Sequence, residues 1–279
     1  MNIILFGGSG FIGRRVTDIL RTRDHLVKTP SRRDFDYLQP DEAAARALLH
    51  GQDCVVNCIG VMSRRTDVLE TVHHHTPALL ARLAAEAGIR NWVQLSALGA
   101  HPAHPVAFVG SKGRGDEVVC GSGLHVNTAR PSVVYGRGGT SCELFIKLAR
   151  LPVLALPAGG RFDLQPVHVN EVAEGLAVMA ETPLPHGTAV DMAGGRRVTL
   201  AQYLSLLRET LHRKPPLRVV PVPLSLIRPV LPLANLLSDG IVSLSSFKLL
   251  EEGSCADTAG FAALLGREPL AAERFADTA

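Results

Sequence analysis

Short apolar runs alternate along the first half of the chain with stretches of helical spacing or helix-favouring composition. The runs of strand length are 3–6, 25–29, 54–60, 92–95 and 126–129. The helical stretches are 11–20, 40–50, 66–87 and 107–120. Pro77 is expected to bend the third of these, and Gly88 is a suitable stop for it. Strands that alternate with crossover helices predict an α/β fold with a doubly wound parallel sheet.

Three glycines follow the first apolar run with the spacing G-x-x-G-x-x-G. Gly7 would permit a sharp strand-to-helix turn, Gly10 would let the backbone approach a pyrophosphate, and Gly13 would let the helix lie close to the sheet. The free N–H groups at the start of the following helix, with its positive dipole end, form an anion site. Because a strand and a helix flank the glycines, the motif predicts a Rossmann-type dinucleotide site.

The regular alternation ends after Pro131. Later signals are a strand near 162–169 that leads into a helix to Ala180, a capping box at Thr199–Gln202 and a short helix at 247–252. We therefore expect a dinucleotide-binding domain over 1–165, with core strands to about residue 130. The remainder, 166–279, is expected to be mostly a smaller α/β substrate lobe, interleaved with the first domain.

Composition narrows the function classes. The formal net charge of +3 over 279 residues is small and no dense Lys/Arg stripe is present, so nucleic acid is not an expected partner. The five cysteines are odd in number and scattered, which is typical of reduced thiols in the cytoplasm. An apolar stretch at 219–238 contains four prolines that would break a membrane-spanning helix, so we expect it to pack on the protein. Contact of this stretch with a membrane surface is the less favoured alternative.

Beyond the glycine loop, several ordered motifs lie between residue 1 and about residue 195. They are Asp34-Phe35, Asn57-Cys58-Ile59-Gly60, Leu95-Ser96-Ala97-Leu98-Gly99-Ala100, Lys112, Arg130-Pro131-Ser132-Val133-Val134-Tyr135-Gly136 and Gln165-Pro166-Val167-His168-Val169. With them the chain resembles an extended or atypical short-chain dehydrogenase/reductase, in the NAD(P)-dependent epimerase/dehydratase-like superfamily. It is most similar to the branch that contains the nucleotide-binding accessory subunit of respiratory complex I and its bacterial relatives.

The resemblance implies a catalytic set of which one member is replaced. In the superfamily, a tyrosine four residues before a lysine transfers the proton, the lysine holds the nicotinamide ribose, and a serine orients the substrate carbonyl. Lys112 is present here, and Ser96 ends the central strand, where it is either the orienting serine or only a strand-end cap. The tyrosine position is occupied by Phe108, whose ring cannot donate or accept a proton.

Histidines offer a substitute proton donor. His101 and His104 lie in the loop before Phe108, and imidazole exchanges protons near neutral pH. His73 stands near a position where the family places a polar residue that faces the cleft. The run His73–His75 falls within one helix, where three consecutive side chains diverge, so we expect no metal site there.

The second strand decides between NAD and NADP. An acidic residue at its end would bind the ribose hydroxyls of NAD, whereas arginine suits the extra phosphate of NADP. Arg32 and Arg33 follow Ser31, and Arg14 follows the last glycine, so NADP is favoured, with NAD as the alternative. The full set of residues implied to contact the dinucleotide is Gly7, Ser9, Gly10, Phe11, Ile12, Gly13, Arg14, Ser31, Arg32, Arg33, Asp34, Phe35, Cys58, Ile59, Gly60, Val61, His73, Lys112, Pro131, Ser132 and Val133.

Two functions fit these observations. The first is an NAD(P)-binding, oxidoreductase-like protein in which Phe108 makes carbonyl reduction weak or absent, as in a cofactor-holding accessory subunit. The second is an active NADPH-dependent oxidoreductase or a sugar-nucleotide epimerase or dehydratase that uses His101 or His104 as the proton donor. Both imply an unknown small-molecule substrate or ligand, and the first allows a protein partner.

Overall fold

The computed structural model describes residues 1–223 and 244–278. The described chain divides into two compact units, and each is discontinuous in sequence. The first unit comprises Met1–Pro131, Asn170–Asp191 and Gly260–Arg267, and the second comprises Ser132–Val169, Met192–Ala259 and Glu268–Ala279. The N-terminal segment of the first unit ends at Pro131, and the chain returns to this unit twice.

A six-stranded sheet in the order β10-β5-β4-β3-β1-β2 forms the centre of the first unit. Its strands are β1 (Asn2–Phe6), β2 (Leu26–Lys28), β3 (Cys54–Asn57), β4 (Asn91–Leu95), β5 (His125–Pro131) and β10 (Ala189–Met192). β1 pairs in parallel with β2 and β3, and β4 pairs in parallel with β3 and β5. The inner strands are buried on both faces, which explains their continuous apolar sequence and confirms the α/β fold with a parallel, Rossmann-type sheet.

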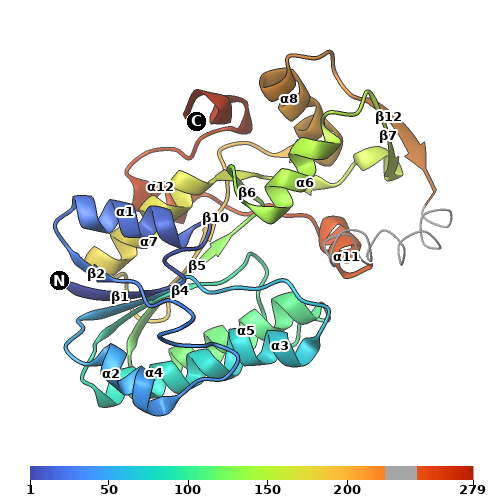
Figure 1. The fold of residues 1–279 in the computed structure, drawn as a ribbon. Helices are drawn as coiled ribbons and strands as arrows, with labels where there is room; N and C mark the ends of the chain where they lie inside the picture. The colour runs from blue at the N-terminus through green and yellow to red at the C-terminus, as the bar shows by residue number, and fades with distance from the viewer. Residues whose placement is uncertain (224–243, 279) are drawn as a thin grey trace. The chain divides into compact units, whose positions relative to one another are not determined.

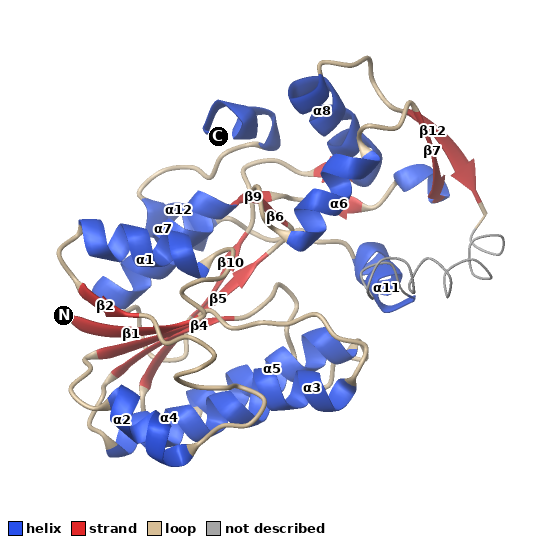
Figure 2. Cartoon of the chain, viewed as in Figure 1, coloured by secondary structure: helices blue, strands red, loops and turns tan. Residues whose placement is uncertain are grey.

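Helices cover both faces of this sheet (Figures 1 and 2). One face carries α2 (Glu42–Leu49), α3 (Thr66–Glu70), α4 (Thr76–Glu86) and α5 (Ala107–Cys120). The other carries α1 (Gly13–Thr22), α7 (Val169–Glu181) and α12 (Ala259–Leu265). Between the sheet and the first set of helices, Trp92 is fully buried, and the rings of Phe6, Phe35 and Tyr37 pack against one another with centroids 5.6–5.8 Å apart, Tyr37 edge to face with the other two.

The helix predicted over 66–87 contains a π-helical turn, η1 (Thr71–His75), between α3 and α4. The amide of Thr76 donates to the carbonyl of Thr71, five residues back. In a regular α-helix, the amide of residue 77 would donate to the carbonyl of His73. Pro77 has no N–H, so the His73 carbonyl does not receive that hydrogen bond. The His73 carbonyl lies against Gly115 of α5, where an added Cβ would stand 1.9 Å from the oxygen. We expected Pro77 to bend the helix; the structure has instead a π-helical turn immediately before Pro77.

The second unit is built from short elements around a separate apolar core. Its strands pair as β6 (Val134–Tyr135) with β9 (Val167–His168), β7 (Val153–Pro157) with β12 (Arg218–Val222), and β8 (Asp163–Leu164) with β11 (Val198–Thr199). Its helical segments are α6 (Thr140–Leu148), η2 (Ala158–Gly160), α8 (Leu200–His212), α11 (Leu244–Glu252) and η3 (Ala272–Thr278). Tyr203 of α8 is fully buried in this core, with Phe162 and Phe247 packed edge to face nearby.

Several local predictions can be compared with these elements. The capping box at Thr199 and Gln202 is present with both reciprocal hydrogen bonds, and the late helix exists as α11. Within the apolar stretch 219–238, residues 219–222 belong to β12, and 224–238 lie outside the described residues. Among the helices that the structure describes, none has the length and apolar character needed to cross a bilayer. All five cysteines are free thiols.

Candidate functional site

The glycine loop joins β1 to α1 with the geometry that its spacing predicts. Gly7 has a φ of +82°, which disfavours any other residue, and its carbonyl accepts a hydrogen bond of 2.9 Å from the amide of Gly10. A Cβ at Gly13 would lie 2.1 Å from the Gly7 carbonyl oxygen, so only glycine lets the helix begin this close to the strand. Ile12, the N-cap of α1, makes no side-chain cap, and no acidic residue occupies the first turn. The positive end of α1 is therefore suited to an anion.

The fourth glycine of the loop has a role that its spacing did not predict. A Cβ at Gly8 would lie 2.4 Å from the side chain of Thr29, just after β2. The loop and the end of the second strand are thus in contact, which brings the turn after β2 close to the glycines. Ser9 and Gly10 are exposed, and Phe11 and Ile12 are half-buried.

The turn after β2 contains the residues expected to select the cofactor. Asp34 accepts hydrogen bonds of 2.8 Å from both the amide and the hydroxyl of Ser31, and these bonds lower the pKa of the carboxyl group. Arg32 and Arg33 are exposed in this turn, and Arg14 is exposed in the first turn of α1.

Phe35, expected from sequence to contact the dinucleotide, is a core residue. Its side chain is only 6% exposed and packs between Phe6 and Tyr37. The position of Phe35 at the end of the turn fits a role in holding that turn against the sheet.

The segment after β3 passes beside the glycine loop. A Cβ at Gly7 would lie 3.0 Å from the Cys58 carbonyl, and one at Gly60 would lie 3.4 Å from the ammonium nitrogen of Lys112. Burial raises the pKa of the Cys58 thiol to about 12, an effect that nearby Lys112 opposes. Ile59 and Val61 are half-buried, and Gly60 is exposed. The segment after β3 therefore lies between the glycine loop and Lys112.

Lys112 is a buried cation at the carboxyl end of the sheet. Its side chain reaches from α5 to β4, where Nζ donates a hydrogen bond of 3.0 Å to the carbonyl of Leu95. Desolvation lowers the pKa of Lys112 to about 8, and Asp116 and Cys58 counteract part of the shift. Lys112 is 5% exposed, so its ammonium group is already positioned by the protein.

Ser96 points toward α5 and bonds to a residue that the sequence motifs did not identify. The Ser96 hydroxyl donates to Asp116 Oδ2 at 2.5 Å, and Arg130 Nη2 lies 3.5 Å from the same oxygen. Burial raises the pKa of Asp116, against the influence of Ser96, Lys112 and Arg130. Asp116 follows Lys112 by one helical turn, a spacing that places both on one face of α5 and could have indicated it. In this position Ser96 acts as a link between β4 and α5.

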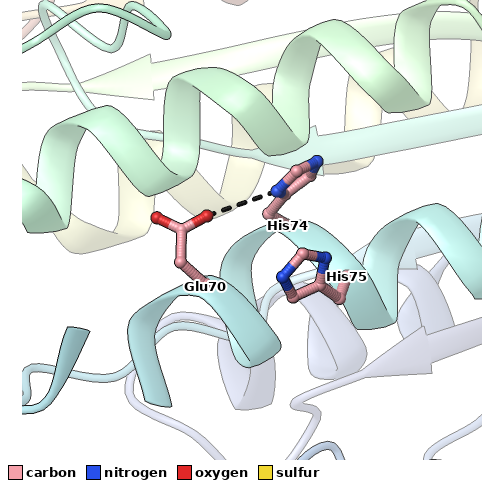
Figure 3. A group of neighbouring side chains, drawn as sticks. All are labelled: Glu70, His74 and His75. Carbon is pink, nitrogen blue, oxygen red and sulfur yellow. Dashed lines mark hydrogen bonds and ion pairs between the residues drawn. The ribbon is translucent and has the colours of Figure 1, made fainter. Parts of the chain in front are cut away.

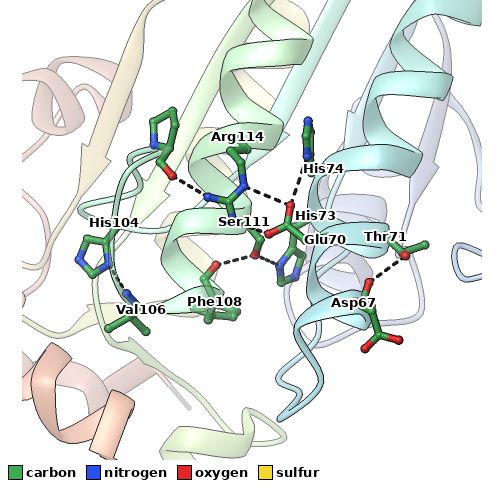
Figure 4. Close-up of polar contacts among 11 residues, drawn as sticks. Asp67, Glu70, Thr71, His73, His74, His104, Val106, Phe108, Ser111 and Arg114 are labelled. Carbon is green, nitrogen blue, oxygen red and sulfur yellow. Dashed lines mark hydrogen bonds and ion pairs between the residues drawn. The ribbon is translucent and has the colours of Figure 1, made fainter.

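His73 and Phe108 lie side by side where α5 meets η1 (Figure 4). The ring centroids are 5.4 Å apart and the planes nearly perpendicular. His73 Nε2 accepts from the amide of Val61 at 3.1 Å, so the proton of the neutral ring is on Nδ1, which donates to Ser111 Oγ at 2.9 Å. Ser111 in turn donates to the Phe108 carbonyl. Burial, with the charge of Lys112, lowers the pKa of His73 to about 2, so the ring is a neutral structural connector.

The two loop histidines lie in the segment before α5. His101 Nδ1 accepts from the amide of Ala103 at 3.3 Å, and His104 Nδ1 accepts from the amide of Val106 at 3.1 Å. Each neutral ring therefore carries its proton on Nε2. His101 is exposed and His104 is half-buried.

The last predicted contacts fall at the division between the units. Pro131 ends β5 in the first unit, where its carbonyl accepts from the amide of Leu98 at 3.0 Å. Ser132 and Val133 begin the second unit, and the Ser132 hydroxyl donates to the carbonyl of Gln165 at 2.6 Å. The residues placed together by the first unit are thus those of the glycine loop, the turn after β2, the segment after β3 and α5.

Comparison with known proteins agrees with this architecture. No family model matches the chain. It is 25% identical over 245 residues to NADH dehydrogenase (ubiquinone) 1 alpha subcomplex subunit 9, mitochondrial, of Arabidopsis thaliana, an alignment that covers 79% of this chain and 60% of that protein. Proteins of the same name from Dictyostelium discoideum and Rattus norvegicus also match, and the chain spans about three fifths of the length of each of these relatives.

Solved structures resemble the fold over most or all of the chain. The human epimerase family protein SDR39U1, determined with NADPH, has a TM-score of 0.73 at 18% identity, with 100% of both chains covered. The UDP-glucose 4-epimerase of Thermus thermophilus, determined with NAD, has a TM-score of 0.62 at 18% identity and covers 80% of this chain and 86% of its own. The chain is therefore a protein of the atypical short-chain dehydrogenase/reductase and NAD(P)-dependent epimerase/dehydratase fold, and it is a distant homologue of the complex I subunit.

Proposed function

We propose that the chain binds NADP(H) in the first unit and holds it with weak or absent carbonyl-reductase activity. The observation that carries this proposal is the pairing of a preserved cofactor anchor with a missing proton donor. Lys112 is buried and held by the Leu95 carbonyl, whereas position 108, one turn earlier on α5, presents a phenyl ring to His73. Hydride transfer to a carbonyl needs a proton for the oxygen, and Phe108 cannot supply it.

The loop between β1 and α1 supports dinucleotide binding. The backbone path of the loop requires its glycines. The side chain of Ile12 makes no capping hydrogen bond to the first turn of α1, and no carboxylate in that turn would repel an anion. The bound group would supply the hydride chemistry of a nicotinamide. Lys112 would hold the nicotinamide ribose, as the resemblance implies, and Arg14 would add positive charge near the phosphates.

The turn after β2 favours NADP over NAD. Oδ2 of Asp34 already accepts two hydrogen bonds from Ser31, so this oxygen is less available to a ribose hydroxyl. Arg32 and Arg33 project from the same exposed turn, and a guanidinium group binds two phosphate oxygens at once. NAD remains the alternative cofactor.

Titration of the purified protein with NADPH and NADH, followed by nucleotide fluorescence, tests the cofactor. We expect micromolar-class binding with NADPH preferred, and Arg32→Ala with Arg33→Ala should remove most of that preference. Arg90→Ala is a matched control, since Arg90 is exposed just before β4, at the opposite end of the parallel sheet. Tighter binding of NADH, or equal loss in the control, would contradict the arginine assignment.

An active enzyme is the alternative, and the tautomers of the loop histidines support it. The neutral rings of His101 and His104 each carry a proton on Nε2, because Nδ1 accepts a hydrogen bond from the loop backbone. If the protein turns over, His101→Ala or His104→Ala should abolish it. The substrate would be a small molecule selected by the second unit.

We further propose a protein partner, because the curated relatives are named as subunits of a larger enzyme. Those relatives are named mitochondrial, whereas the free cysteines of this chain fit a reducing compartment such as the cytoplasm.

A further inference from the structure

We propose that Glu70, His74 and His75 form a binding site for a divalent transition-metal cation (Figure 3). Each side chain offers one ligand atom, and the three atoms all lie within 4.8 Å of one another. Glu70 and His74 are half-buried and His75 is exposed, so an ion reaches the group from solvent. This site lies outside the residues assigned to the dinucleotide.

The spacing of the ligand atoms suits a tetrahedral ion. His74 Nδ1 and Glu70 Oε2 are 3.3 Å apart, long for a hydrogen bond between an imidazole and a carboxylate. Two ligands at about 2.1 Å from a tetrahedral zinc ion are separated by roughly 3.4 Å. The first two ligands therefore already have the required separation, and His75 completes a three-ligand set by a rotation of its side chain.

The π-helical turn is the reason that two consecutive histidines can cooperate. In an α-helix, His74 and His75 would diverge, which was the reason for expecting no metal site from sequence. In η1 the wider turn reduces the angle between successive side chains, and the two rings lie 4.6 Å apart with their planes inclined by 30°. His73 alone follows the expected divergence and points inward to Ser111.

Arg114 of α5 sets the environment of the carboxylate. Its Nε lies 3.1 Å from Glu70 Oε2, Nη2 contacts Oε1, and Nη1 donates to the Pro102 carbonyl at 2.6 Å. The guanidinium group bonds to both oxygens of the carboxylate and so fixes its orientation, as the hydrogen-bonding partners of metal ligands do. Its positive charge also weakens the attraction of Glu70 for a cation. We therefore expect a site of moderate affinity.

The donor set selects the kind of metal. Two imidazole nitrogens and one carboxylate oxygen are typical ligands of Zn²⁺, Co²⁺ and Ni²⁺, whereas Mg²⁺ and Ca²⁺ prefer oxygen ligands alone. Three protein ligands leave at least one position for water or an external group.

Tag-free protein titrated with Zn²⁺ by calorimetry, and with Co²⁺ by its visible absorption, tests the site. We expect one ion per chain and a Co²⁺ spectrum of low coordination number. Affinity should fall at least about tenfold in His75→Ala and in Glu70→Gln. Since neither measurement involves a nucleotide, the result is independent of the proposed function.

Two matched variants keep the test specific. Arg114→Gln breaks the same ion pair as Glu70→Gln but retains all three ligands, so it should bind the ion at least as tightly as the wild type. His50→Ala removes another exposed histidine, at the C-cap of α2, and should bind normally. Absence of stoichiometric binding by the wild type, or equal losses in His50→Ala and His75→Ala, would overturn the proposal.

Discussion

Phe108 and Lys112 lie one turn apart on α5. Lys112 is the residue that the resemblance requires for carbonyl reduction, whereas Phe108 lacks the hydroxyl group that the reaction needs. Lys112 keeps a buried ammonium group at the end of β4, and Phe108 places a ring against His73 where the resemblance implies a hydroxyl. Phe108→Tyr should therefore raise carbonyl-reductase turnover, by about 10²-fold, the usual contribution of a positioned proton donor. Steady-state NADPH oxidation over a panel of carbonyl compounds measures it, with Phe108→Leu as the control that changes the ring but adds no hydroxyl. A rate that is unchanged or lower in Phe108→Tyr would show that proton transfer occurs elsewhere.

His73 gives a pH dependence of stability. Its pKa falls from 6.5 to about 2 in the folded protein, so between these values the unfolded chain binds a proton that the folded chain does not. The contribution of His73 is therefore complete above pH 6.5 and is lost as the pH decreases. It should add a slope approaching about 1.4 kcal/mol per pH unit to the free energy of unfolding. Urea unfolding at pH 7, 6, 5 and 4 should show a smaller slope for His73→Gln than for the wild type, and parallel curves would contradict the assignment.

For single residues, the sequence predicted where a residue lies in the fold better than it predicted the side chains to which that residue bonds. Gly7, Gly13 and Lys112 lie where their motifs place them, because their environment is set by the adjacent strand and helix. The bonds of Ser96 to Asp116 and of His73 to Ser111 join segments 20 and 38 residues apart, and no local pattern encodes them.

Helix α5 packs closely on its neighbours because Gly110, Gly113 and Gly115 lack side chains. A Cβ at Gly113 would lie 2.2 Å from the backbone of His101, and one at Gly115 would lie 1.9 Å from the His73 carbonyl oxygen. Gly115→Ala should therefore destabilise the fold by about 1–3 kcal/mol or more, since the added methyl group forces the backbones apart. Gly121→Ala at the end of the same helix is the control, because its Cβ would meet only ordinary contacts beyond 3.5 Å. Equal midpoints of urea unfolding for the two variants would show that the contact is easily relaxed.

The helices and strands of the first unit up to Pro131 could be predicted from sequence because each carries a complete local signal, whereas the later β10 and α12 of the same unit were not predicted. The buried strands are continuous apolar runs, and the helices between them are long enough to show their spacing. The π-helical turn could not be predicted, because Pro77 indicates only that a backbone bond is missing. Its geometry also depends on Gly115, which lies on another helix.

For the whole molecule, the first unit contains every residue whose geometry supports nucleotide binding, so a ligand should stabilise it. Binding at 100 times the dissociation constant adds about 2.7 kcal/mol, which should raise the thermal midpoint by roughly 5 to 10 °C. Calorimetry with NADPH, NADH and reduced nicotinamide mononucleotide measures this. The mononucleotide lacks the diphosphate bridge and should have little effect. A midpoint that neither dinucleotide shifts would contradict the site.

The second unit was least predictable. Four of its strands, β6, β8, β9 and β11, have two residues each, and they pair with segments 33 to 36 positions away. Strands of this length have no periodicity, so only the capping box of α8 and the late helix α11 gave a local signal.

The contact between the His73 carbonyl and Gly115 makes two distant positions interdependent. A residue other than proline at position 77 would have an amide that can bond to the His73 carbonyl, as in an ordinary α-helix. The carbonyl would then no longer need the space that the absence of a side chain at Gly115 provides. Over evolutionary time, proline at one position and glycine at the other should be gained and lost together. The arrangement of the three neighbouring imidazoles, which depends on the π-helical turn, should change with that pair.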